Sequence, residues 1–388
     1  MEIREIVNRE KEYIINLRRY FHAHPESSLK EFNTASKIEK ELGTLGIPYE
    51  RVGETGVAAY IGGLNPGKTL ALRADIDALE IQELNELDYA SVNKGLMHAC
   101  GHDAHTASLL GAAKILKKKE DQIQGKIKLF FQQAEEIGQG ARQFIALGHL
   151  KDVDNILGFH VSTDLDTGKI AVTPGPIAAS CDYFKVIIEG KSSHVSRPQT
   201  GIDALYMACQ SVVNLQAIVA RETDPLDPVV VGVGVLNSGT RYNIIANEAV
   251  IEGTFRTFSQ ETRVKTQESI RRIFETTAET HKGKAKIEFY SYSSPVINHE
   301  NAAKFATSVA KELVGLDNVI TNQEKALSAD DFAEFQLEVP GVYVNIGAKN
   351  PLDKSTHFPQ HHGNFNIDEK ALLIGTEFYV RYALKYLG

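Results

Sequence analysis

The apolar residues of the N-terminal half fall into short unbroken runs separated by segments with helical spacing. Three runs, TLALRAD, KIKLFFQQ and NILGFHV, have no polar alternation, which is typical of strands buried on both faces of a sheet. Residues 103–119 lie between the first two runs, carry apolar side chains on one face and end in lysines, so they are expected to form a helix. Helices are also expected over residues 5–21 and 33–45. This order of elements predicts an α/β domain.

A second pattern begins after Pro174-Gly-Pro. It predicts a strand over residues 185–190, a helix over 202–221, strands in VVVGVGVL and EAVIEGTFRTF, a helix over 260–281 and a strand in KAKIEFYS. The order β-α-β-β-α-β is that of a ferredoxin-like unit.

The α/β pattern returns after Ser294-Pro295. It contains a predicted helix over 301–314, the strand GVYVNIGA and a helix over 368–386. We therefore expect residues 180–294 to form a domain inserted into a domain made of residues 1–179 and 295–388.

Charge and composition exclude several classes of partner. The 388 residues carry a formal net charge of −8, which argues against binding to nucleic acid or anionic lipid. The N-terminus is charged and no apolar run approaches the span of a bilayer, so a cytoplasmic protein without membrane contact is expected. The three cysteines are odd in number and widely spaced, which argues against a disulfide framework and leaves a functional cysteine to act as a thiolate.

Side chains that can bind metals or carry protons follow the predicted buried strands. In open α/β sheets ligands collect at the carboxyl ends of the strands, so these side chains are expected to converge at one edge. They are Asp75, Asp77, Glu135, Glu136 and His160, with Cys100 and His102 before the helix of the same unit and His361 in a loop after the last strand.

The number of potential ligands predicts two metal ions. Cys100 and His102 would diverge on a helix, so a turn at Gly101 is needed for both to face one centre. A catalytic zinc ion takes about three protein ligands and a water, whereas five candidates suit two ions about 3.5 to 4 Å apart. The five are Cys100, His102, Glu136, His160 and His361. Thiolate and imidazole favour zinc over magnesium or calcium, and the Cys100 thiolate is a candidate bridge.

Glu135 and Glu136 are expected to point to opposite sides of a strand end and to have different roles. One can bind metal while the other takes a proton from a metal-activated water, as hydrolysis of an amide requires. The residues leave other interpretations open. Cys100 could be a nucleophile with His102 or His105 as its base, the glutamates could be a solvated pair, and His194 could be an ordinary loop histidine.

Six motifs resemble those of the N-acyl-amino-acid amidohydrolases, the metallopeptidase branch that includes aminoacylases, hippurate hydrolases and indole-acetyl-amino-acid hydrolases. They are MHACGHDAHTASLLGAA, QQAEEIGQGA, GFHV, GKSSHVSRP, YNIIANEAVIEGTFRTF and HHGNFNIDE, and the similarity extends from FHAHPE to the C-terminal helix. The resemblance implies a zinc-peptidase-like catalytic α/β domain with an inserted ferredoxin-like dimerisation or lid domain. It also implies that Cys100, His102, Glu136, His160 and His361 bind two divalent ions per subunit, Zn²⁺ or Mn²⁺, with Co²⁺ and Ni²⁺ also used in the family.

The same resemblance assigns roles to five further residues. Glu135 would be the general base, and His194 would help to hold the oxyanion, reaching into the site of the partner subunit. Asn243 and Arg256 would bind the substrate carboxylate, a task that suits a bidentate guanidinium. Asp77 would orient a ligand histidine.

The expected activity is metal-dependent hydrolysis of the amide bond of N-acyl-L-amino acids by a homodimer formed through the inserted domain. A dipeptidase or carboxypeptidase with the same metal centre and a non-catalytic metal-binding scaffold are the alternatives. Three departures from the family pattern, Gln133, Asp330 and Gly363, affect the expected substrate preference and leave the reaction type unchanged.

Overall fold

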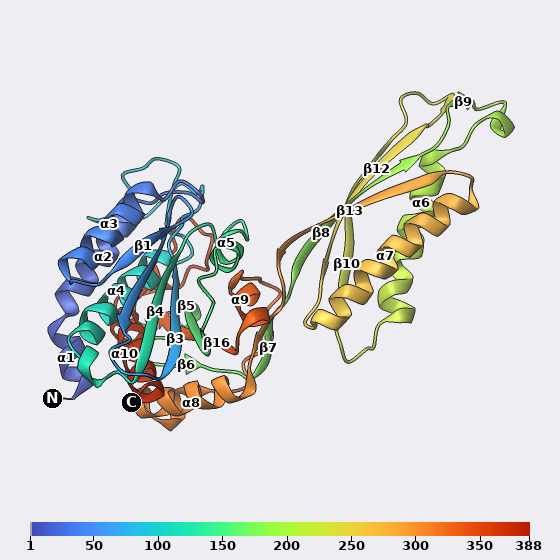
Figure 1. The fold of residues 1–388 in the computed structure, drawn as a ribbon. Helices are drawn as coiled ribbons and strands as arrows, with labels where there is room; N and C mark the ends of the chain where they lie inside the picture. The colour runs from blue at the N-terminus through green and yellow to red at the C-terminus, as the bar shows by residue number, and fades with distance from the viewer. Residues whose placement is uncertain (1) are drawn as a thin grey trace. The chain divides into compact units, whose positions relative to one another are not determined.

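The computed structural model describes residues 2–388 and divides them into two compact units (Figure 1). Unit 1 comprises the chain up to Gly175 together with Ile297–Glu324 and Asp330–Gly388. Unit 2 comprises Pro176–Val296 and the short segment Lys325–Ala329, which the sequence pattern did not assign to an inserted domain. No helix within residues 2–388 has both the length and the apolar character needed to cross a bilayer.

Unit 1 is built on an eight-stranded mixed sheet with the order β1-β2-β4-β3-β5-β16-β6-β15. The central strands β4, β3, β5 and β16 run parallel and are almost completely buried, as the three apolar runs predict. The strands are β1 (Tyr49–Val52), β2 (Gly56–Gly62), β3 (Lys68–Asp75), β4 (Gly125–Gln132), β5 (Asn155–Asp166), β6 (Ile170–Ala171), β15 (Val319–Ile320) and β16 (Gly341–Lys349).

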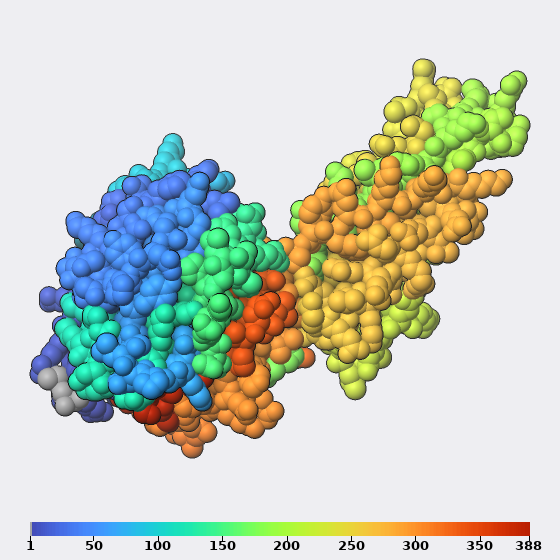
Figure 2. All heavy atoms as spheres, in the orientation of Figure 1, coloured from blue at the N-terminus to red at the C-terminus, as the bar shows by residue number. Residues whose placement is uncertain are grey.

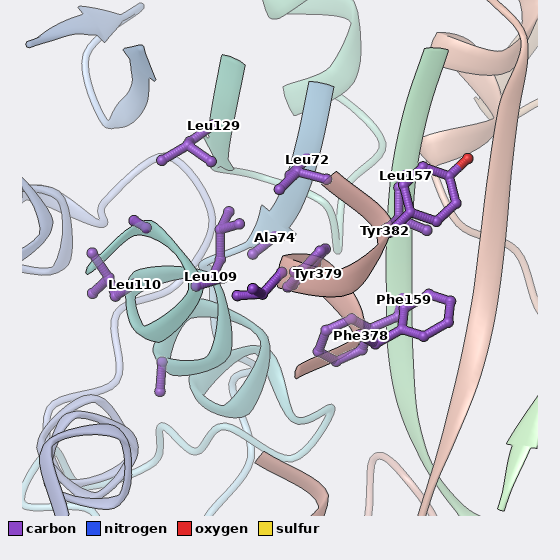
Figure 3. Packing of buried hydrophobic residues seen from close by; sticks show 14 of the residues in the cluster. Leu72, Ala74, Leu109, Leu110, Leu129, Leu157, Phe159, Phe378, Tyr379 and Tyr382 are labelled. Atoms are coloured by element: carbon purple, nitrogen blue, oxygen red, sulfur yellow. The ribbon is translucent and has the colours of Figure 1, made fainter. Parts of the chain in front are cut away.

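Two helices pack directly against the centre of this sheet. Figure 3 shows side chains of α4 and α10 meeting those of β3, β4 and β5 in one apolar core. Helices from both ends of the chain complete unit 1, and its surface accordingly carries N-terminal and C-terminal segments side by side (Figure 2). The helices are α1 (Ile3–Arg9), α2 (Lys11–Ala23), α3 (Phe32–Thr44), α4 (His102–Lys117), α5 (Gly140–Ala146), α8 (Glu300–Val314), α9 (Phe332–Glu338) and α10 (Lys370–Tyr386).

The first predicted helix is interrupted at Glu10. Its backbone has φ −92° and ψ 3°, which ends α1 and begins α2. The carboxylate of Glu10 lies 2.6 Å from Lys114 Nζ and 2.7 Å from Lys118 Nζ, so tertiary ion pairs with α4 hold this residue where local spacing predicts a continuous helix.

Unit 2 has the ferredoxin-like arrangement that the sequence predicts. Its four-stranded antiparallel sheet has the order β10-β12-β8-β13, and its two long helices pack with the sheet around a separate apolar core. The elements are β8 (Cys181–Glu189), α6 (Ala204–Ala217), β10 (Val230–Ser238), β12 (Glu248–Arg256), α7 (Gln260–Thr280) and β13 (Lys284–Ser293), with β9 (Ser193–His194) paired to β11 (Ile244–Ile245). The predicted fold class, a catalytic α/β domain with a ferredoxin-like insertion, is confirmed.

Candidate metal centre

The carboxyl ends of β3, β4 and β5 lie at one edge of the sheet and bring the predicted residues together. His102 begins α4, and the preceding Gly101 has φ +92°. A Cβ atom on Gly101 would lie 2.4 Å from Val161 Cγ2, so only glycine allows the Cys100–His102 turn to approach β5 this closely.

The five predicted ligands fall into two groups that share one member. Cys100 lies with His102 and His160 in the first group and with Glu136 and His361 in the second, and the ligand atoms of each group are all within 4.8 Å of one another. Within the first group, Cys100 Sγ lies 3.4 Å from His160 Nε2. Glu136 bridges the groups, with Oε1 3.8 Å from His102 Nε2 and Oε2 3.6 Å from His361 Nε2.

The donor atoms fit a pair of divalent cations. Within residues 2–388, His102 Nε2 and Glu136 Oε1 are buried and have no hydrogen-bond partner. Buried polar atoms are costly when left unpaired, and a cation would compensate both. One thiol, three imidazoles and one carboxylate exceed what a single catalytic zinc ion takes, and the thiol and imidazoles suit zinc-like metals.

Hydrogen bonds fix the orientation of the imidazoles of His102 and His160. His102 Nδ1 donates to the carbonyl oxygen of Asp77 at 2.9 Å, and His160 Nδ1 donates to the carbonyl oxygen of Val161 at 2.7 Å. Both Nε2 atoms therefore face the cluster, the arrangement that is typical of metal-bound histidines.

Asp77 supports two candidate ligands at once. Its Oδ2 accepts the N–H of Glu136 at 3.0 Å, and its Oδ1 lies 3.3 Å from His102 Nδ1. Burial alone would raise the pKa of Asp77, but the hydrogen bond and charge of His102, together with hydrogen bonds from Ser28 and the N–H of Glu136, outweigh burial and leave this pKa below its ordinary value.

Glu135 and Glu136 do not point apart as strand alternation predicts. Carboxylate oxygens of both residues lie within 4.8 Å of each other and of His102. The reason is that β4 ends at Gln132 and Ala134 has φ +53°, so the pair stands on a turn. Burial raises the pKa of Glu135 well above its ordinary value, with Asp330 and Glu136 adding to the effect. Burial also raises the pKa of Glu136, to about 7.

His105 is placed differently from a ligand or a base. Its Nδ1 donates to Asp75 Oδ1 at 2.5 Å and its Nε2 accepts the N–H of Val161 at 3.0 Å. Both ring nitrogens are therefore engaged, which argues against His105 as the base of a nucleophilic Cys100.

A buried network of Arg73 and three aspartates lies beside Glu135 and was not predicted from the sequence. Arg73 contacts Asp75 at 2.5 Å, Asp331 at 2.9 Å and Asp330 at 3.2 Å. The N–H of Asp331 donates to Glu135 Oε1 at 3.4 Å. An arginine within the otherwise apolar run TLALRAD was the available signal, because a buried guanidinium needs acidic partners.

The loop after β16 carries His361 with φ +61°, and the N–H of His361 donates to the carbonyl oxygen of Ala99 at 2.9 Å. The neighbouring His362 stacks on Phe358 instead. Gly363, one of the departures from the family pattern, packs so closely that a Cβ would lie 2.8 Å from the carbonyl oxygen of Gln82.

The remaining predicted residues lie in unit 2. His194 and Ile244 are register partners between β9 and β11, and the adjacent Asn243 lines a shallow depression of about 390 Å³ with His194 and Arg241. Asn243 lies just before β11, which precedes the first residue of β12, whereas Arg256 is the last residue of β12. Eight steps of about 3.3 Å separate Glu248 from Arg256, so the two ends of β12 are about 26 Å apart. Within one chain, Asn243 and Arg256 therefore do not meet.

Comparison with known proteins agrees with this arrangement. The sequence pattern that defines peptidase family M20/M25/M40 matches residues 71–385. Thermostable carboxypeptidase 1 of Saccharolobus solfataricus is 37% identical over 99% of this chain and 97% of its own length. N-acetyl-L-cysteine deacetylase of Bacillus subtilis is 38% identical over 96% of this chain and 88% of its own length.

A solved structure of a Bacillus subtilis protein, described as a dinuclear metal binding peptidase from the M20 family, is also similar. It is 35% identical and superimposes with a TM-score of 0.84, covering 98% of this chain and 99% of that protein. The family resemblance of the motifs is thus confirmed. The chain belongs to peptidase family M20/M25/M40 and is a hydrolase of the metallopeptidase type.

Proposed function

We propose that the protein hydrolyses the amide bond of N-acyl-L-amino acids, with two divalent cations held by Cys100, His102, Glu136, His160 and His361. The observation that carries this proposal is the pair of donor groups sharing Cys100, with the carboxylate of Glu135 beside them. The deacetylase named above, which is similar over nearly the whole chain, supports the substrate class.

Cations held by these residues would supply a lowered pKa of bound water and polarisation of the amide carbonyl. Glu135 takes a proton from the attacking water and delivers it to the leaving amine. A carboxyl group whose pKa is raised by burial is suited to carrying a proton between two groups. Asp77 keeps His102 in one orientation throughout, because its carbonyl oxygen and carboxylate both face Nδ1 of that ring.

We further propose that the working form is a homodimer in which His194 and Asn243 act on the substrate held by the other copy. Asn243 precedes the first residue of β12 and Arg256 is its last residue, which supports this proposal, since a single chain does not bring both to one carboxylate. Arg256 would hold the substrate carboxylate with its guanidinium fork, and His194 would donate a hydrogen bond to the carbonyl oxygen. Nδ1 of His194 accepts from the N–H of Ser196 at 3.1 Å, so Nε2 carries the hydrogen and can donate this hydrogen bond.

Zinc is the cation that the thiol and imidazole donors favour, with manganese as the second candidate. We place the enzyme in the cytoplasm, because a cysteine that acts as a metal ligand must stay reduced. Small N-acyl amino acids are the proposed substrates, without nucleic acid or membrane partners.

A carboxypeptidase or dipeptidase activity is the second candidate, favoured by the similarity to a carboxypeptidase over 99% of the chain. One substrate panel separates the two. We expect N-acetyl, N-benzoyl and indole-acetyl amino acids to be cleaved after loading with Zn²⁺ or Mn²⁺, and free-amine dipeptides to be cleaved far more slowly. Equal cleavage of both classes would favour the peptidase, and cleavage of neither would overturn the proposal.

A further inference from the structure

Glu31 is a buried carboxylate far in sequence from the candidate metal centre. Its side chain is fully buried just before α3, and its Oε1 accepts the N–H of Ala134 at 2.9 Å across 103 residues of sequence. Burial, together with the nearby charge of Asp77, raises the pKa of Glu31 to about 7. A carboxylate in such surroundings is unfavourable for folding, and an apolar side chain would fill the same space at lower cost.

The residue that Glu31 contacts is the strained point of the turn that carries Glu135 and Glu136. Ala134 has φ +53°, a conformation that residues with a Cβ rarely adopt unless their surroundings enforce it. Its carbonyl oxygen accepts the N–H groups of Gln139 at 3.1 Å and Gly140 at 3.3 Å. Its N–H is directed to Glu31, and this hydrogen bond is therefore one of the contacts that keep Ala134 in the left-handed region.

A second carboxylate holds the other end of the same turn. Asp77 Oδ2 accepts the N–H of Glu136 at 3.0 Å. The segment Ala134-Glu135-Glu136 is therefore held at both ends by hydrogen bonds to carboxylates from separate loops. The backbone between these two hydrogen bonds determines where the carboxylates of Glu135 and Glu136 stand relative to His102. A displacement of about 1 Å at such a position is enough to cost about a hundredfold in rate.

We propose that Glu31 is a positioning residue, which sets the place of Glu135 and Glu136 through the backbone of Ala134 without touching the substrate. The inference rests on the proposed function for the roles of the two glutamates. The positioning itself is inferred from two hydrogen bonds alone, from the Ala134 N–H to Glu31 and from the Glu136 N–H to Asp77.

The decisive comparison is between Glu31→Met and Glu31→Gln, which are similar in size and differ in whether an oxygen can accept the Ala134 N–H. For Glu31→Met we expect kcat to fall about a hundredfold with KM within about threefold. Zinc affinity of the metal-free protein, measured by competition with a chelator in the absence of substrate, should fall about tenfold. Glu31→Gln should restore both quantities to within about threefold of the unaltered protein.

Glu26→Met is the matched control. Glu26 lies in the same loop and accepts the backbone N–H groups of Asn33 at 3.2 Å and Thr34 at 2.8 Å, so its loss weakens the start of α3 without reaching the turn. We expect a lower melting temperature with unchanged kcat and zinc affinity. An equal fall in Glu26→Met, or kcat and zinc affinity unchanged in Glu31→Met, would overturn the proposal.

Two further arms keep the test decisive. If Glu31→Met does not fold, Glu31→Asp takes its place, because it keeps the charge but withdraws the acceptor by one methylene. This variant should also have a lower kcat and a lower zinc affinity. Unchanged values would overturn the proposal. If no N-acyl amino acid is cleaved by the unaltered protein, the proposed function fails, and the zinc measurement still decides the role of Glu31.

Discussion

The metal centre of unit 1 and the tip of unit 2 both gather polar side chains from separate segments, but they hold them differently. In unit 1 the side chains of His102 and Glu135 are almost completely buried, and each has hydrogen-bonding neighbours from other segments of the chain. In unit 2, His194 on the short ribbon of β9 and β11 and Arg241 in the turn before β11 are exposed beside a shallow depression. The first arrangement is preorganised within one chain, whereas the second has the character of half a site.

This difference indicates where chemistry and recognition are divided. Preorganised buried groups are worth most where charge develops during reaction. Exposed groups such as His194 and Arg241 are suited to meeting a second surface. Perturbing unit 1 should therefore lower turnover more than perturbing unit 2.

Removal of metal should have the largest effect. A chelator is expected to abolish turnover, and Zn²⁺ or Mn²⁺ should restore it, because buried donors such as His102 Nε2 lack another partner in the described chain. Metal should also stabilise the fold by about 4 kcal/mol at a thousandfold excess over Kd, measured as a shift in melting temperature. Full turnover in a preparation that elemental analysis finds free of metal would contradict this prediction.

Glu135→Gln should have the next largest effect. The amide keeps the size of the side chain but cannot take a proton, so kcat should fall about a thousandfold or more while both metal ions are retained. Kinetics and elemental analysis on the same sample test the two halves of this statement. Unchanged kcat would remove Glu135 as the base, and loss of metal would assign it to the ligands.

His194→Ala tests whether unit 2 acts across a dimer. We expect kcat to fall about a hundredfold, since one donor to the developing oxyanion is lost. Subunit exchange between His194→Ala and Glu135→Gln should then restore about one quarter of the activity, because mixed dimers contain one intact site. No recovery on mixing, in samples shown to exchange, would confine His194 to its own subunit or remove it from the site.

Arg256→Lys should act on binding more than on chemistry. Lysine keeps the charge but loses the bidentate fork, so KM is expected to rise about tenfold with kcat nearly unchanged. Steady-state kinetics with an N-acetyl amino acid and with the corresponding amide, which lacks the carboxylate, separate this role from a structural one. The rise in KM should be absent for the amide.

The elements that could be predicted from sequence are those with a strong local pattern. Unbroken apolar runs identified β3, β4 and β5, and the β-α-β-β-α-β order identified unit 2. The two-residue strands β6 and β15 carry too few residues for any periodicity, and the largely exposed β1 lacks the apolar pattern of the central strands.

The candidate site divides in the same way. The candidate ligands sit at strand ends or in recognisable motifs, so the sequence alone could nominate Cys100 and His160. Glu31 could not be nominated, because its contact with Ala134 spans 103 residues. Arg73 stood out as a charge in an apolar run, but its partner Asp331 lies 258 residues away and has no local signal. The opposed directions expected for Glu135 and Glu136 failed because the left-handed backbone of Ala134 has no local signature in its side chain.

The smallest expected effect on turnover comes from a buried ion pair in unit 2. Arg263 donates to Asp182 through Nε at 2.9 Å and Nη2 at 2.7 Å, and Asp182 is fully buried. Arg263→Met should leave this carboxylate buried without its cation and lower the stability of unit 2 by about 3 kcal/mol, measured by urea unfolding. Arg271→Met is the control, since Arg271 and Glu275 form an exposed pair 3.7 Å apart whose loss should cost about 0.3 kcal/mol. If unit 2 supplies a surface and unit 1 the chemistry, folded Arg263→Met should keep its kcat at saturating substrate. A loss of kcat in proportion to the loss of stability would show instead that the rigidity of unit 2 enters the chemical step, and the division drawn between the two regions would not hold.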